Sequence, residues 1–299
     1  MGWRIICIEK ANRINYKLNS LGVVDNNEVV WICLDEIDLI IVETLLCNVS
    51  FKLLSEVSKR GISLIICGDN HMPLGMLNSI VDNNRSAKYN RFQIEWSKKA
   101  KRDVWTEIIK HKILLQLLVL KKYNKNKEKI ELLATYYNHV ELGDISNREG
   151  HAAKVYFNEL FGVEFTRQRD AEDIINSSLN YIYQIARSKI AQEIVSHGYI
   201  PSLGIFHCSE YNYYGLADDI IEVFRPLLDY YVIDIINKEE IKFMTTSYKE
   251  KLLNVFYNYI NYGKSKQKIL ESIRLCVINI TDVLSNNDIS KLTFPMFYD

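Results

Sequence analysis

At residues 82–91 the chain reads Asp82-Asn83-Asn84-Arg85-Ser86-Ala87-Lys88-Tyr89-Asn90-Arg91, and this polar stretch separates two different hydrophobic patterns. Before it, short apolar or alternating runs are separated by glycine and asparagine, which is typical of β-strands joined by turns. From Trp96 onward, apolar residues recur at helical spacing. We therefore expect an α+β protein with a small N-terminal β-rich domain over residues 1–81, a linker over 82–94 and a larger all-α domain over 95–299.

The apolar periodicity also predicts the individual elements. The strands are expected at Arg4 to Glu9, Arg13 to Leu18, Val29 to Leu34, Leu39 to Glu43 and Ile62 to Cys67, with one amphipathic helix at Ser50 to Lys59. In the second part, helices are expected near 95–122, 128–138, 149–161, 171–197, 217–236, 248–261 and 265–285. Alternating β and α units with a glycine-rich fingerprint are missing, so a dinucleotide-binding sheet is disfavoured.

Composition narrows the class of protein. A hydrophobic share of 48% and a charged share of 25% are ordinary for a globular chain of 299 residues. No apolar run approaches the roughly 18 residues of a membrane span, and the N-terminus lacks the layout of a signal peptide. We therefore expect a cytoplasmic protein without a membrane partner. Six cysteines occur without a C-x-x-C pair, which disfavours a zinc ribbon or a redox motif.

The charges are unevenly distributed although the formal net charge is zero. Residues 82–130 hold 14 basic and 5 acidic side chains, whereas residues 1–81 hold 7 and 9, and residues 131–299 hold 16 and 23. One basic segment between two acidic ones is a localised electrostatic footprint of the kind that binds phosphates. A solvated, lysine-rich helix surface is the alternative interpretation.

Three short segments of the C-terminal half carry metal-ligating side chains. The first contains Glu149, which shares a helix face with Ala152, Ala153 and Tyr156. A carboxylate aligned with an apolar stripe should point towards the interior or a cleft, where its charge requires a partner or a metal. The alternative is a first-turn carboxylate that is stabilised by the helix dipole.

The other two segments contain His207 and Glu222. His207 follows a loop with a glycine and a proline, so it can present a ring nitrogen to a site or cap a helix. Glu222 shares a helix side with Asp218, Asp219 and Arg225, where three acids close together repel each other unless a cation relieves them. A solvated acidic face is equally compatible with this pattern. Carboxylates and one imidazole suit Mg²⁺ or Mn²⁺ better than a thiolate-seeking metal.

The sequence does not match two further catalytic motifs, the P-loop and the G-x-S-x-G sequence. Gly263-Lys264-Ser265 ends like a P-loop, but Asn258 stands where the first glycine would be. No serine lies in a G-x-S-x-G sequence, so an α/β-hydrolase elbow is absent. These absences favour metal-assisted chemistry on phosphates over nucleotide hydrolysis or acyl transfer.

Taken together, these segments resemble the CRISPR adaptation integrase, the Cas-one family, over essentially the whole chain. The motifs that carry the resemblance are Asn147 to Asn158, Phe165-Thr166-Arg167, Gly204-Ile205-Phe206-His207 and Leu216 to Pro226. The start Met1-Gly2-Trp3-Arg4 and the stretch Trp105 to Ile109 resemble its type II-A branch. Two positions depart from that branch, because Val223 replaces a usual proline and Gly215 a usual asparagine.

The resemblance implies a β-sandwich-like dimerising domain followed by a helical catalytic domain. It also implies that Glu149, His207 and Glu222 are the catalytic residues and bind one Mg²⁺ or Mn²⁺. The implied reaction is spacer acquisition by transesterification, in which a DNA 3′-hydroxyl attacks a phosphodiester of the CRISPR repeat, with an associated endonuclease activity. A catalytically silent DNA-binding scaffold is the main alternative, and a structure-selective nuclease is a third hypothesis.

The same resemblance implies partners. It implies binding of double-stranded DNA fragments and of CRISPR repeat DNA. It further implies a homodimer that forms a heterohexamer with a small Cas-two subunit, with Csn-two and Cas-nine as additional participants. The side chains predicted to bind DNA are Arg85, Lys88, Arg91, Lys98, Lys99, Arg167 and Arg225.

Overall fold

The structure is a computed structural model that describes residues 2–26, 28–69, 71–79, 84–168 and 173–298. The chain divides into two compact units, Met1–Asn90 with Gln184–Tyr199, and Arg91–Tyr183 with Ile200–Asp299. We predicted that the first domain consists of residues 1–81, but Gln184–Tyr199, which includes the second part of a later helix, also belongs to the first unit. Two polar contacts hold this part of the helix in the first unit: Lys189 pairs with Asp38 at 2.8 Å in a buried position, and the partly buried Gln192 amide donates to the Gly61 carbonyl at 3.0 Å.

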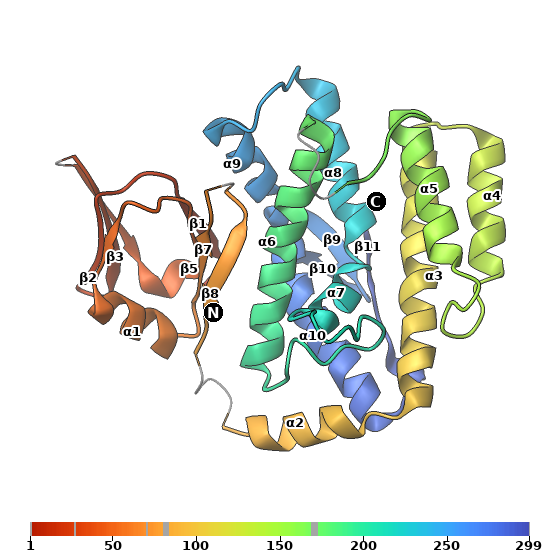
Figure 1. Cartoon of the computed structure of the whole chain (residues 1–299), viewed down its shortest axis with the longest axis horizontal. Helices are drawn as coiled ribbons and strands as arrows, with labels where there is room; N and C mark the ends of the chain where they lie inside the picture. Colours follow the sequence, from red (N-terminus) through yellow and green to blue (C-terminus); the bar gives the residue numbers. More distant parts are fainter. Residues whose placement is uncertain (1, 27, 70, 80–83, 169–172, 299) are drawn as a thin grey trace. The chain divides into compact units, whose positions relative to one another are not determined.

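The first unit contains two four-stranded sheets (red to orange in Figure 1). One has the order β1-β5-β7-β8, in which β1, β5 and β7 are parallel and β8 is antiparallel to β7. The other has the order β4-β3-β2-β6, in which β2, β3 and β4 form an antiparallel meander. The strands are β1 (Arg4–Ile8), β2 (Arg13–Lys17), β3 (Ser20–Asp25), β4 (Glu28–Cys33), β5 (Ile37–Val42), β6 (Asn48–Val49), β7 (Ser63–Cys67) and β8 (Pro73–Leu77).

One apolar core serves both sheets. Strand β5 is buried at all six positions, as expected for a central parallel strand that is covered on both faces. Helix α1 (Phe51–Lys59) lies between β6 and β7 in the chain and buries Leu53 and Val57 in the same core as Ile14 and Leu21. Ser50 begins α1 as its N-cap and accepts a hydrogen bond from the Leu53 amide at 3.3 Å. A short 3-10 turn (Leu34–Glu36) precedes β5.

The expected linker over 82–94 is wrong for most of its length, because α2 (Ser86–Glu95) is helical there. Residues 82 and 83 lie outside the described part of the chain. Gln93 is buried, and its amide donates to the carbonyls of Ile200 and Leu203, both at 2.9 Å, and accepts from the Ile200 amide at 2.8 Å. The buried Gln93 amide thus satisfies three backbone groups of the segment over residues 200–203 and holds this polar helix against it.

The second unit is mainly helical. Helix α3 lies beside α4, α5 and α8 in Figure 1 and contacts each of them. The helices are α3 (Lys98–Lys122), α4 (Lys127–Asn138), α5 (Arg148–Phe161), the first part of α6 (Ile174–Ser196), α7 (Gly215–Ile221), α8 (Arg225–Lys238), α9 (Thr246–Asn254) and α10 (Ile269–Asn286), with 3-10 turns at Val255–Tyr257 and Ile289–Lys291. Within the described residues, no helix has the length and apolarity needed to cross a membrane.

The prediction of an all-α second domain is wrong at its end. A three-stranded antiparallel sheet has the order β10-β9-β11, with β9 (Tyr259–Tyr262), β10 (Ser265–Lys268) and β11 (Pro295–Phe297). Strands β9 and β10 form a hairpin whose turn includes Gly263 at a φ of 58°. Short hairpin turns require such positive φ values, which glycine adopts without strain. The sequence Gly263-Lys264-Ser265, which ends like a P-loop, therefore belongs to a hairpin. This hairpin lies where helices had been predicted over 248–261 and 265–285.

Candidate active site

A buried ammonium lies between two of the predicted ligands. Lys112 is on α3, and its Nζ pairs with Oε2 of Glu222 at 2.5 Å and with Oε1 of Glu149. Lys112 and Glu222 are buried, whereas the Glu149 side chain is 31% exposed. Because Glu149 and Glu222 lie 73 positions apart in the sequence, only the packing of α3 against α5 and α7 brings them to one cation.

The first turn of α5 holds Glu149. Asn147 begins the helix at a φ of 52° and accepts a hydrogen bond from the Gly150 amide at 3.2 Å. Asp144 accepts from the amides of Arg148 and Glu149 at 2.8 and 3.0 Å. These two side chains satisfy the helix-start amides, so the Glu149 carboxylate is available for Lys112.

Glu222 stands at a break between two helices. The sequence predicted one helix over 217–236, but α7 ends at Ile221 and α8 begins at Arg225. Pro226 has no amide hydrogen to donate to the Glu222 carbonyl four residues earlier, and its ring would clash with that carbonyl in a continuous helix. The break leaves Glu222 beside Arg225, whose Nε donates to Oε1 of Glu222 at 2.8 Å.

Two cations keep Glu222 ionised. Burial alone would raise its pKa, but Arg225 and Lys112 outweigh burial and lower the pKa to about 2. Burial would likewise lower the pKa of Lys112, but Glu222 and Glu149 raise it above its ordinary value. The site therefore combines the ionised carboxylate of Glu222 with an ammonium and a guanidinium.

His207 is held by a loop that wraps around Asp219. The fully buried Asp219 carboxylate accepts hydrogen bonds from the amides of Ile205, Phe206 and His207, the last two at 3.2 and 3.0 Å. It also accepts from Nδ1 of His207 at 2.8 Å. When Nδ1 carries the hydrogen, the Nε2 of the neutral ring keeps its lone pair for a ligand.

The charge and packing around His207 follow from the same loop. The hydrogen bond to Asp219 raises the pKa of His207, burial opposes it, and the charges of Asp219 and Glu222 add to the increase. The Trp105 indole stacks on Phe206 at 4.4 Å and meets the His207 ring edge-on at 5.6 Å. A Cβ at Gly215 would lie 2.3 Å from the His207 carbonyl oxygen, so an asparagine at this position would require the loop that holds His207 to shift.

A cavity of about 490 Å³ opens beside the two carboxylates. Its wall includes the Tyr183 ring, with the guanidiniums of Arg225 at 4.5 Å and Arg167 at 5.3 Å from the ring centroid. The Tyr183 hydroxyl donates to Asp229, whose pKa is raised to about 6 because burial outweighs the neighbouring cations. The other lining residues include Lys112, Gln116, Glu149, Lys154, Phe157, Phe165 and Glu222.

Sequence comparison identifies the family. The profile described as "CRISPR associated protein Cas1" matches residues 5–260. A CRISPR-associated endonuclease Cas1 from Neisseria meningitidis serogroup C (strain 8013) is 30% identical over 296 residues, which are 99% of this chain and 96% of that relative. This chain belongs to the Cas1 family. The family expected from the motifs is confirmed, and the type II-A branch stays a prediction.

Solved structures of Cas1 proteins and of a casposase share the fold of this chain. A CAS1 protein from Thermotoga maritima matches with a TM-score of 0.78 at 14% identity, over 95% of this chain and 97% of that chain. A casposase bound to an integration product matches with a TM-score of 0.73 at 17% identity, over 96% and 92%. A chain of a Cas6-RT-Cas1–Cas2 complex matches with a TM-score of 0.77 at 18% identity, over 97% of this chain and 36% of that one.

The predicted Cas1 ligands are only partly gathered. Glu149 and Glu222 both pair with Lys112, and the charge of Glu222 helps to raise the pKa of His207. The ligand atoms of Glu149, Glu222 and His207 nevertheless do not form a compact set. Their assignment as metal ligands stays a prediction. Asp218 accepts from the Asn212 amide at 2.9 Å, so of the two further acids Asp219 is the one that orients His207.

The predicted DNA-binding side chains fall into two groups. Arg167 and Arg225 line the cavity, and Arg167 also donates to the side chains of Asn176 and Asn180 at 2.9 and 2.7 Å. The other five are exposed on or next to α2 and at the start of α3, namely Arg85, Lys88, Arg91, Lys98 and Lys99.

Sequence reasoning missed Lys112, although a usable signal exists. Lys112 repeats with Ile108, Leu115 and Val119 on the buried stripe of α3. A lysine on an apolar stripe needs a buried acid as partner, and the same argument had already singled out Glu149. Tyr183 and Asp229 give no comparable signal, because their relation depends on two helices that are distant in sequence.

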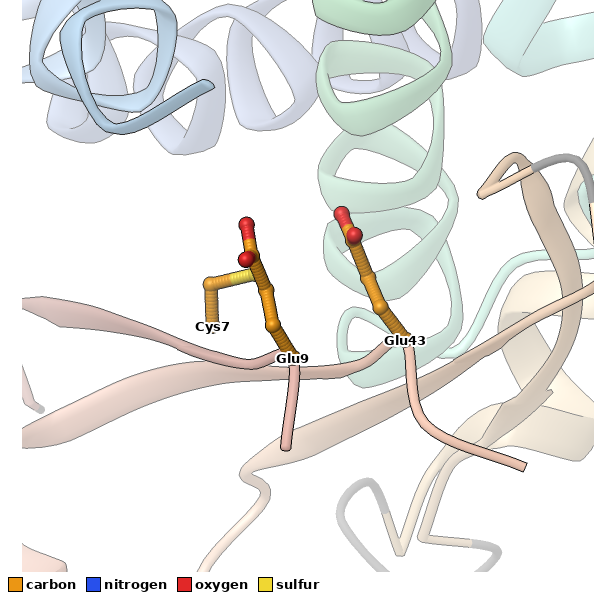
Figure 2. A group of neighbouring side chains, drawn as sticks. All are labelled: Cys7, Glu9 and Glu43. Carbon is orange, nitrogen blue, oxygen red and sulfur yellow. The ribbon is translucent and has the colours of Figure 1, made fainter. Parts of the chain in front are cut away.

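A compact set of metal-ligating atoms lies in the first unit instead. Across the described residues, the one such group found is Cys7, Glu9 and Glu43, with ligand atoms within 4.8 Å of one another. Figure 2 shows the three side chains projecting from one side of the ribbon. The parallel register of β1 and β5 pairs Ile8 with Val42 and so places the following glutamates side by side. Nδ1 of His71 lies 3.0 Å from Oε2 of Glu43. None of these residues was predicted from the sequence to belong to a site.

Proposed function

We propose that this Cas1 family member is a metal-dependent DNA integrase of CRISPR spacer acquisition with an associated endonuclease activity. The observation that carries the proposal is the convergence of Glu149 and Glu222 on one cation beside the oriented imidazole of His207. Two carboxylates and one imidazole are a donor set for Mg²⁺ or Mn²⁺. The Lys112 ammonium supports the proposal, because it lies between the two acids where such an ion would need negative charge.

A bound divalent ion would supply Lewis-acid stabilisation of charge on a phosphodiester. Glu149, Glu222 and His207 would hold it, and Asp219 would keep His207 Nε2 available by accepting from Nδ1. Arg225 and Arg167, which line the cavity, would contact phosphate oxygens of the DNA. The exposed basic side chains of α2 and α3 would bind the backbone further away.

The proposed reaction exchanges one phosphodiester for another. The oxygen of a fragment's 3′-hydroxyl forms a bond to a repeat phosphorus, the bond from that phosphorus to the repeat's 3′-oxygen breaks, and the proton leaves the attacking hydroxyl as the departing oxygen gains one. No phosphodiester bond is lost overall, so no nucleotide is needed to drive the reaction. Hydrolysis at the same site would use water in place of the 3′-hydroxyl.

We further propose that the chain acts in the cytoplasm as a homodimer joined to a Cas2 partner, with double-stranded DNA fragments and repeat DNA as substrates and with Csn-two and Cas-nine as participants. Family membership supports the Cas2 partner, since one structural neighbour is named as a complex that contains Cas2.

A strand-transfer assay tests the function. A labelled duplex with a free 3′-hydroxyl is incubated with a repeat-bearing plasmid, the protein and its Cas2 partner, with and without Mn²⁺. We expect joined products only with the ion, and their loss in Glu149→Gln, Glu222→Gln and His207→Ala. Intact DNA binding without metal-dependent joining would favour the scaffold hypothesis, and cleavage without joining would favour a plain nuclease.

A further inference from the structure

The Lys112 ammonium occupies the place between Glu149 and Glu222 that a metal ion would need. Its Nζ pairs with Oε1 of Glu149 and lies 2.5 Å from Oε2 of Glu222, and the lysine is 6% exposed. Arg225 holds the other oxygen of Glu222 at 2.8 Å. The oxygens engaged by Lys112 are therefore distinct from the one fixed by Arg225.

The Lys112 ammonium and a divalent ion cannot both bind these carboxylate oxygens without an electrostatic cost. An ammonium and a divalent ion a few ångströms apart repel each other strongly in a buried site, where screening by water is weak. Lys112 also lines the cavity of about 490 Å³, so its flexible four-carbon stem has space into which it can turn. Arg225 can remain in place because its contact is on the opposite oxygen.

We propose that Lys112 is a built-in counter-cation that holds Glu149 and Glu222 together in the metal-free protein and leaves them when a divalent ion binds. This inference depends on the proposed metal site. Lys112 is then a positioning residue that competes with the metal, and its removal tightens metal binding although it removes a favourable contact. A purely structural lysine would act in the opposite direction, since its loss would leave the acids less organised and the ion less tightly bound.

The test is a titration of the full chain with Mn²⁺ in the absence of DNA. Binding is measured by calorimetry and by the electron paramagnetic resonance signal of free Mn²⁺. We expect Lys112→Met to bind Mn²⁺ at least about tenfold more tightly than the wild-type protein, because one competing positive charge is gone. Lys112→Arg, which keeps the charge, should bind within about threefold of wild type. Equal or weaker binding by Lys112→Met overturns the proposal.

Lys189→Met is the matched control. Lys189 is also a buried ammonium between two carboxylates, at 2.8 Å from Asp38 and 2.6 Å from Glu193, but it belongs to the first unit. Its loss should leave Mn²⁺ affinity at the wild-type value. A tenfold gain in both methionine variants would mean that any lost buried cation tightens binding, which also overturns the specific role of Lys112.

A second measurement covers the case in which Lys112→Met does not fold. Wild-type protein is reductively methylated with and without Mn²⁺, and Lys112 modification is followed by peptide mass spectrometry. We expect Mn²⁺ to increase modification of Lys112 but not of Lys189, and no increase at Lys112 overturns the proposal. If Glu149→Gln and Glu222→Gln keep full Mn²⁺ binding, the proposed metal site itself is wrong. If these two variants lose Mn²⁺ binding but Lys112→Met binds Mn²⁺ with the wild-type affinity, the metal site stands and only the proposed role of Lys112 is wrong.

Discussion

Lys112 and Lys189 each place a buried ammonium between two carboxylates, one in each unit of the chain. Burial would lower the pKa of both lysines, and in both cases the paired acids raise it instead. The surroundings differ. The Asp38 and Glu193 side chains are 10% and 4% exposed, whereas Glu149 is 31% exposed.

The difference shows what separates a structural ion triad from a candidate site. Lys112 itself lines the large cavity, so it has space to leave its partners. The cavity beside the other triad is smaller, at about 290 Å³. Its described lining residues include Asp38 and Glu193 but not Lys189. Glu222 also keeps a second cation, Arg225, if Lys112 departs. An exchangeable central cation is therefore the property by which we propose that the triad around Lys112 differs from the triad around Lys189.

The largest expected contrast is in activity. Glu222→Gln should reduce metal-dependent strand joining by at least about 10³-fold, or about 4 kcal/mol of transition-state stabilisation, because an amide cannot supply the negative charge that holds the ion. Glu193→Gln removes an equally buried carboxylate from the other triad and should leave joining unchanged. A plasmid-joining assay on both variants checks this, and similar losses in the two would remove the distinction between the triads.

Stability should show the reverse order. Lys189→Met leaves two enclosed carboxylates around an apolar side chain and should lower the free energy of unfolding by about 3–5 kcal/mol. Lys112→Met should cost only about 1–2 kcal/mol, because Glu149 reaches solvent and Arg225 still pairs with Glu222. Urea denaturation of both variants measures the difference, and a greater loss for Lys112→Met would contradict the account.

His111, the neighbour of Lys112 on α3, is a buried base whose pKa is shifted by no acid of the described residues. Its Nε2 lies 2.8 Å from the Pro295 carbonyl oxygen, and burial lowers its pKa to about 4 despite that contact. As the pH falls, His111 in the unfolded state binds a proton at a higher pH than His111 in the folded state. The contribution of His111 to the free energy of unfolding is therefore fully present above about pH 6.5 and decreases by about 3 kcal/mol as the pH drops towards 4. His111→Gln should flatten this part of the curve of unfolding free energy against pH, and an unchanged slope would exclude His111 as its source.

The smallest contrast concerns helix caps. Asn147→Ala and Ser50→Ala each remove an N-cap and should each cost about 1 kcal/mol in thermal or urea unfolding. Only Asn147 caps the helix that carries Glu149, so only its substitution should also slow strand joining. Equal joining rates in the two variants would mean that the first turn of α5 does not position the carboxylate.

Much of the site could be predicted from sequence, because it depends on local pattern and motif. Glu149 was singled out because it lies on an apolar stripe. Asp219 was named only as one of the acids on the helix side of Glu222, and its hydrogen bond to His207 was not predicted. The helix break at Glu222 was missed although Pro226 signals it, since the surrounding apolar spacing continues across the break. The hairpin at Gly263 was missed for the same reason. Lys112 as a shared partner could not be paired in advance, because only tertiary packing decides which buried acids meet a buried lysine.

The most direct test of the central claim is anomalous diffraction from crystals of the protein grown with Mn²⁺. The account predicts one strong peak bound by Glu149, Glu222 and Nε2 of His207, with the Lys112 ammonium turned away from both carboxylates. A peak only at Cys7, Glu9 and Glu43, or Lys112 still bridging its two acids at saturating Mn²⁺, would contradict it.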